Sequence, residues 1–82
     1  MQLKYVRHST IGFVLWPKTD ALWHSHVGDL LRRKDGGRII SAGFCTVSDG
    51  AVHCYGRSES LDIGGAPDDA KALASQLGIK AA

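Results

Sequence analysis

The tripeptide Ser48-Asp49-Gly50 is the feature that most constrains how this chain can fold. It joins two runs that are rich in β-branched and aromatic residues, residues 38–47 and residues 51–56. An Asp-Gly pair between such runs predicts a β-hairpin, because glycine readily adopts the positive φ that a tight turn requires. We therefore expect the middle of the chain to form two antiparallel strands.

The length of this turn decides which residue lies opposite each cysteine. A two-residue loop pairs Cys45 with Cys54 as a non-hydrogen-bonded pair, with the two Cα atoms about 4.5 Å apart. A three-residue loop puts Cys45 opposite His53 instead. A disulfide in the first register would be strained and easily reduced. We therefore expect both thiols to pack as small core side chains.

A helix is predicted between two strand hairpins. Residues 3–8 and 11–16 are strand-like and form the first hairpin. Val27, Leu30 and Leu31 follow with the spacing i, i+3, i+4 of one helix face. The start of this helix is open, because Asp20 suits the N-cap of a long helix and Ser25 that of a short one.

The last third of the chain predicts an extended segment and a second helix. Residues 58–63 alternate polar and apolar, which predicts a continuation of the second hairpin or a separate edge strand. The second helix runs from Pro67 to Gly78, because proline suits a first helical position and glycine a helix end. Residues 80–82 are expected to fray.

Together these elements predict one α+β domain over residues 1–82, in the order β-β-α-β-β-α. We expect an antiparallel sheet of four or five strands with both helices on one face, so that the sheet buries both apolar stripes. The predicted core consists of Val6, Phe13, Leu15, Val27, Leu30, Leu31, Ile40, Val47, Val52, Leu73 and Leu77.

Composition excludes several classes of protein. The chain is 44% hydrophobic and 22% charged, which is typical of a globular protein rather than a disordered one. No apolar run approaches the roughly 18 residues of a membrane span, and the first residues lack a signal-peptide pattern. We expect a cytoplasmic protein with reduced thiols and no membrane contact.

Catalytic and metal-binding patterns are not found in the sequence. No serine lies in a GxSxG motif. His24 and His26 are two residues apart and would point away from each other on a helix, and no cysteine pair has zinc-ligand spacing. We therefore predict a protein that is not an enzyme and that has no cofactor, no metal site and no catalytic residues.

The best candidate for a binding feature is a basic run. Arg32, Arg33 and Lys34 follow the first predicted helix, with Arg38 nearby. Such a run could contact phosphates or an acidic partner, but it also suits the negative end of a helix dipole. The net charge of +2 is far below that of a dedicated nucleic-acid binder.

Several segments resemble one group of known proteins. They are Gly12–Pro17, Ser25-His26, Ile40–Phe44 and Cys54–Ser60. Together they look like segments of small uncharacterised proteins encoded by phages and prophages of proteobacteria. The resemblance implies an accessory protein that binds a host protein or a nucleic acid, and it carries over no functional residue. We predict a small non-enzymatic interaction protein whose partner is another protein or a second copy of the chain, with nucleic-acid binding through the basic run as the alternative.

Overall fold

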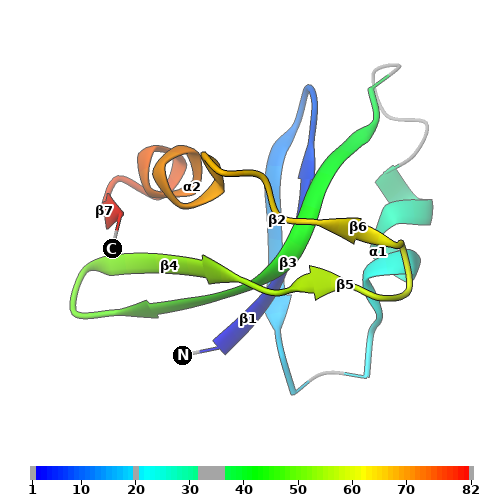
Figure 1. Cartoon of the computed structure of the whole chain (residues 1–82), viewed down its shortest axis with the longest axis horizontal. Helices are drawn as coiled ribbons and strands as arrows, with labels where there is room; N and C mark the ends of the chain where they lie inside the picture. Colours follow the sequence, from blue (N-terminus) through cyan, green and yellow to red (C-terminus); the bar gives the residue numbers. More distant parts are fainter. Residues whose placement is uncertain (1, 20, 32–36, 82) are drawn as a thin grey trace.

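The structure of the chain, a computed structural model, describes residues 2–19, 21–31 and 37–81 (Figure 1). It has the predicted α+β class, with two helices and a mostly antiparallel five-stranded sheet. The strands are β1 (Gln2–His8), β2 (Gly12–Pro17), β3 (Ile39–Ser48), β4 (Ala51–Tyr55), β5 (Arg57–Ser58), β6 (Ile63–Gly64) and β7 (Lys80–Ala81), and the helices are α1 (His24–Leu31) and α2 (Asp69–Leu77).

The central hairpin is confirmed with the two-residue loop. Cys45 lies opposite Cys54 in the register of β3 and β4, and both cysteines are free. Asp49 and Gly50 have φ values of 52° and 73°. Two successive positive φ values define the turn type whose twist matches that of the flanking strands, which explains why the sequence uses Asp-Gly here.

The five strands of the sheet have the order β2-β1-β3-β4-β7. The predicted fraying is wrong for Lys80 and Ala81, because they form β7 and pair in parallel with Ala51 and Val52 of β4, whereas Ala82 lies outside the described residues. The segment 58–63 does not form an edge strand of this sheet either. Its ends belong to β5 and β6, which pair with each other as a separate two-stranded hairpin.

The two helices pack on opposite faces of the sheet, whereas the sequence predicted one face. Tyr5 and Val6 are neighbours on β1 and therefore point to opposite faces. Tyr5 packs in a cluster with Leu73 of α2, and Val6 packs in another with Val27 of α1. The order of elements along the chain does not specify the face onto which each helix folds, which is why the prediction of one shared face was wrong.

Three residues of the predicted core are exposed: Leu30, Ile40 and Leu77. On α1 the buried residues are His24, Val27 and Gly28, with Leu31 partly buried beside them, so the stripe begins at His24, three positions before Val27. Leu30 lies off this stripe and is 72% exposed. The prediction failed because histidine and glycine occupy two core positions of the helix.

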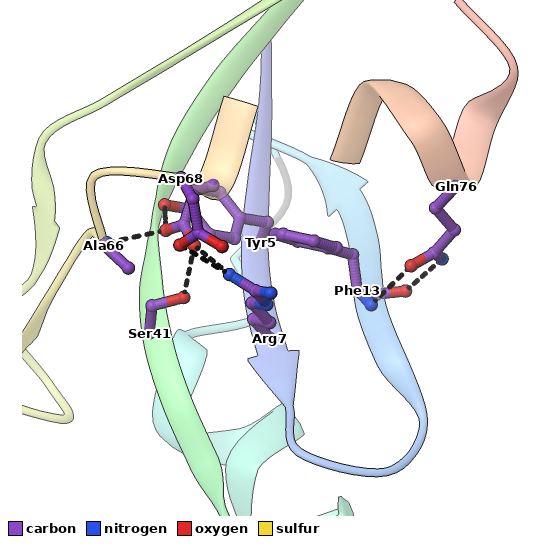
Figure 2. Close-up of polar contacts among 8 residues, drawn as sticks. Tyr5, Arg7, Phe13, Ser41, Ala66, Asp68 and Gln76 are labelled. Atoms are coloured by element: carbon purple, nitrogen blue, oxygen red, sulfur yellow. Dashed lines mark hydrogen bonds and ion pairs between the residues drawn. The ribbon is translucent and has the colours of Figure 1, made fainter. Parts of the chain in front are cut away.

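Helix α2 is held to the sheet by its side chains at both ends (Figure 2). At its start, the buried carboxylate of Asp69 accepts hydrogen bonds from the Tyr5 hydroxyl, from Ser41 Oγ at 2.8 Å and from the Ala66 amide at 2.8 Å. The Arg7 guanidinium adds an ion pair at 3.1 Å. The sequence pattern predicted the helix but not this role of Asp69 in the core.

At the other end of α2, Gln76 binds the backbone of the edge strand β2. The Phe13 amide donates to Gln76 Oε1 at 2.8 Å, and Gln76 Nε2 donates to the Phe13 carbonyl at 3.0 Å (Figure 2). The helix then ends as predicted, at Gly78 with a φ of 71°, and the Ile79 amide turns back to the Ala74 carbonyl.

Candidate functional site

The predicted basic site is only partly covered by the structure. Arg32, Arg33 and Lys34 lie outside the described residues. Arg38 is exposed, and its backbone makes two hydrogen bonds with Ser9. The Ser9 amide donates to the Arg38 carbonyl at 2.8 Å, and the Arg38 amide donates to Ser9 Oγ at 2.9 Å. Arg38 is therefore fixed beside the turn between β1 and β2.

A different surface carries aromatic and basic side chains together. Trp16, Lys4, Phe44 and Tyr55 are direct neighbours across β2, β1, β3 and β4. Residues in register across a sheet share one face, and this is the face on which α1 packs. Trp16 is buried near α1, whereas Phe44 and Tyr55 are only partly buried.

Lys18 adds a positive charge to this aromatic row. Its Nζ lies 4.9 Å from the Phe44 ring centroid and 5.5 Å from that of Tyr55. The two rings are stacked with centroids 5.9 Å apart, and the exposed His53 ring stacks on Tyr55 at 6.1 Å. Three consecutive rings and an ammonium group thus form a continuous surface on the sheet.

An open groove of about 680 Å³ adjoins this row. Its lining includes Trp23 and His24 at the start of α1, Phe44 on the sheet, and Lys4 and Arg57. Trp23 is 60% exposed and stacks on His26, with ring centroids 5.6 Å apart. We call the residues Lys4, Lys18, Trp23, His24, Phe44, Tyr55, Arg57, Glu59 and Ser60 the aromatic-basic groove.

His24 lies at the base of the groove and fixes its geometry. The side chain is buried, and Nε2 donates to the Gly43 carbonyl at 2.7 Å. Its ring contacts Trp16 and Phe44 edge-on, at centroid distances of 5.3 and 5.2 Å. Burial lowers the pKa of His24, and repulsion from Lys4 lowers it further, against the opposing effect of the bond to Gly43. The ring is therefore neutral near pH 7.

This pKa predicts a loss of stability in mild acid. Unfolded histidine titrates near pH 6.5, and the folded protein holds His24 at a lower pKa. Below about pH 6.5 the unfolded chain therefore binds more protons, so the free energy of unfolding falls as the pH drops from about 6.5 toward the lowered pKa. Urea midpoints at pH 7.5 and pH 5 measure this fall.

The matched variants for this measurement are His24→Gln and His26→Gln. We expect His24→Gln to reduce the pH dependence of the urea midpoint between these two pH values. His26→Gln, at an exposed histidine, should leave the pH dependence of the urea midpoint unchanged. An unchanged pH dependence in His24→Gln would contradict the assignment to His24.

The groove offers binding groups more than reactive ones. Ser60 Oγ accepts a hydrogen bond from the Ser25 amide at 3.1 Å. The Cys54 thiol lies outside the groove, and burial together with nearby Cys45 raises its pKa to about 12, so it stays protonated at neutral pH. Within the part of the chain that the structure describes, no group of three His, Cys, Asp or Glu residues could hold a metal ion.

Sequence reasoning missed most of this groove. Phe44 and Tyr55 are predicted only as strand residues, and no local pattern connects them with Trp23. The two-residue loop that pairs Cys45 with Cys54 also pairs Phe44 with Tyr55, so the register contained the signal. The loop after β5, which supplies Glu59 and Ser60, had no such signal because its path depends on tertiary packing.

Comparisons with protein-family models, with curated proteins and with solved structures find no match for this chain. Neither helix in the described residues is long and apolar enough to cross a membrane.

Proposed function

We propose that the protein binds a single-stranded nucleic acid in the aromatic-basic groove. The observation that carries this proposal is the row of stacked rings on the sheet, with Lys18 Nζ 4.9 Å from the Phe44 centroid and with Trp23 exposed across the groove. Bases that are free of a duplex can stack on such rings, and each stacked base contributes about 1–3 kcal/mol.

The charges around the groove favour a nucleic acid over a cationic peptide. Lys4 and Arg57 line it, and Lys18 lies over the neighbouring rings. Glu59 is the single acidic residue among the groove residues. A phosphate backbone that passes these cations gains electrostatic attraction, to which Arg57 contributes less because it already pairs with Asp62 at 2.6 Å, whereas a lysine or arginine side chain would be repelled.

The groove is preferred to the basic run because the described residues form it completely, whereas Arg38 lies beside the β1–β2 turn and Arg32, Arg33 and Lys34 lie outside the described residues. The protein partner, the homodimer, the cytoplasmic location and the phage setting inferred from the sequence stay predictions.

Replacing Trp23 with alanine should weaken binding of single-stranded oligonucleotides about tenfold, because one stacking surface is lost. Fluorescence anisotropy with labelled pentanucleotides of RNA and DNA, at 50 and 300 mM salt, measures the dissociation constants. The wild-type affinity should fall with salt, and duplexes should bind less well because their bases are already stacked.

Leu30→Ala is the matched control, since it removes another exposed apolar side chain, in this case from α1. Its affinity should equal that of the wild type. If no oligonucleotide binds at 50 mM salt, the proposal is wrong, and the groove becomes the first surface to test for the predicted protein partner.

A further inference from the structure

Glu59 is the polar residue of the groove that stacking and phosphate contacts leave unexplained. It lies in the loop between β5 and β6 and lines the groove together with Trp23 and Phe44. Its carboxylate makes no hydrogen bond or ion pair with any residue that the structure describes. The two carboxylate oxygens of Glu59 are thus hydrogen-bond acceptors without a partner, next to the aromatic rings of the groove.

The backbone around Glu59 is fixed even though its side chain is not. Ser58 is fully buried, and its Oγ accepts a hydrogen bond from the Leu61 amide at 3.1 Å. Ser60 Oγ accepts one from the Ser25 amide at 3.1 Å, which ties the loop to the start of α1. Trp23 lies two residues before Ser25, so the same bond keeps Glu59 and Trp23 on facing parts of one groove.

We propose that Glu59 makes the groove selective for guanine. This inference rests on the proposed function, and it concerns the base that stacks in the groove rather than the binding of single strands in general. Guanine carries N1–H and N2–H donors side by side on its Watson–Crick edge, and a carboxylate presents two acceptor oxygens. The two groups form a pair of charge-assisted hydrogen bonds, which are stronger than neutral ones.

The other bases meet the same carboxylate less favourably. Adenine and cytosine offer one amino donor beside a ring nitrogen whose lone pair faces the second carboxylate oxygen. Uracil and thymine offer one N–H between two carbonyl oxygens, which the carboxylate repels. Selectivity therefore comes both from bonds gained by guanine and from repulsion of its competitors.

The groove volume and charges agree with a nucleotide as the occupant. Its volume of about 680 Å³ lies within the range of about 300–1,000 Å³ that is typical of small-molecule sites. Lys4 and Arg57 line the groove beside Glu59, so a ligand with both a phosphate and N–H donors is complementary to it. A simple cation would be attracted by Glu59 but repelled by Lys4, and less strongly by Arg57, which pairs with Asp62.

The test compares four labelled RNA pentamers that differ at one position, UUGUU, UUAUU, UUCUU and UUUUU, by fluorescence anisotropy at 50 mM salt. The wild type should bind UUGUU about tenfold more tightly than the other three. Glu59→Gln should abolish this preference, because the amide supplies one acceptor instead of two and has no charge. Its affinity for UUUUU should stay equal or rise.

Asp49→Asn is the matched control for the loss of one negative charge. Asp49 lies in the turn between β3 and β4, far from the loop between β5 and β6 (Figure 1), and asparagine tolerates its φ of 52°. This variant should keep the preference for UUGUU. Trp23→Ala should weaken all four pentamers together.

The outcomes separate this inference from the proposed function. If all four pentamers bind the wild type equally, or if Glu59→Gln keeps the preference for UUGUU, the role of Glu59 is wrong while single-strand binding stands. If none of the four binds, both proposals are wrong.

Discussion

Replacing Asp69 with alanine is expected to destabilise the protein by about 3–5 kcal/mol, the usual cost of removing one partner from a buried charged network. The carboxylate is 1% exposed and receives the Tyr5 and Ser41 hydroxyls, the Ala66 amide and the Arg7 guanidinium. Alanine leaves the buried Tyr5 and Ser41 hydroxyls without this acceptor. For a domain of this size the melting temperature should fall by roughly 15–30 °C.

Asp68 provides the matched control for this change. It is the preceding residue and also pairs with Arg7, at 3.0 Å, but its side chain is 63% exposed. Asp68→Ala should therefore change the melting temperature by only a few degrees, as is usual for exposed ion pairs. Circular dichroism measures both melting temperatures. If they fall equally in the two variants, the burial of Asp69 is not what stabilises the start of α2.

Replacing Gly43 with alanine is the second change with a large expected effect. A Cβ at this position would lie 2.9 Å from the Tyr55 carbonyl oxygen and 3.2 Å from that of Gly56. Both contacts involve backbone, which cannot rotate away as a side chain can. We expect a loss of about 1–3 kcal/mol in the free energy of unfolding, in the range of overpacked cores.

The Gly43→Ala change should also alter the geometry of the groove. The Gly43 carbonyl accepts the hydrogen bond of His24, so a displaced β3 moves the base of the groove. Gly64→Ala is the control, because a Cβ there meets only Arg57 Cβ, at an ordinary distance of 3.9 Å. Urea titrations of both variants measure the effect, and a stable Gly43→Ala protein would show that β3 and β4 can separate at low cost.

The sequence predicted local structure well where one or two residues determine it. Asp49 and Gly50 set the turn, and through the turn they set every pair of the central hairpin. Gly78 ended the second helix as expected, because few residues other than glycine adopt its left-handed conformation readily. These features depend on backbone sterics, which a short stretch of sequence specifies.

The sequence predicted poorly what depends on contacts between distant segments. Asp69 and Tyr5 are 64 residues apart, and their hydrogen bond follows from the docking of α2 rather than from any local pattern. The sequence pattern argued only against His24 as a metal ligand, yet its ring is buried against Phe44. Buried polar groups of this kind have no periodicity, so hydrophobic patterning could not identify them.

The two hydrogen bonds between Gln76 and Phe13 have a consequence for the behaviour of the protein in concentrated solution. An edge strand normally presents free amide and carbonyl groups that a strand of another molecule can pair with. In this protein the Gln76 side chain forms hydrogen bonds with both the amide and the carbonyl of Phe13, as a neighbouring strand would. If α2 detaches, the core beneath Leu73 and this part of β2 are uncovered in the same event. Resistance to aggregation is therefore tied to the docking of one nine-residue helix.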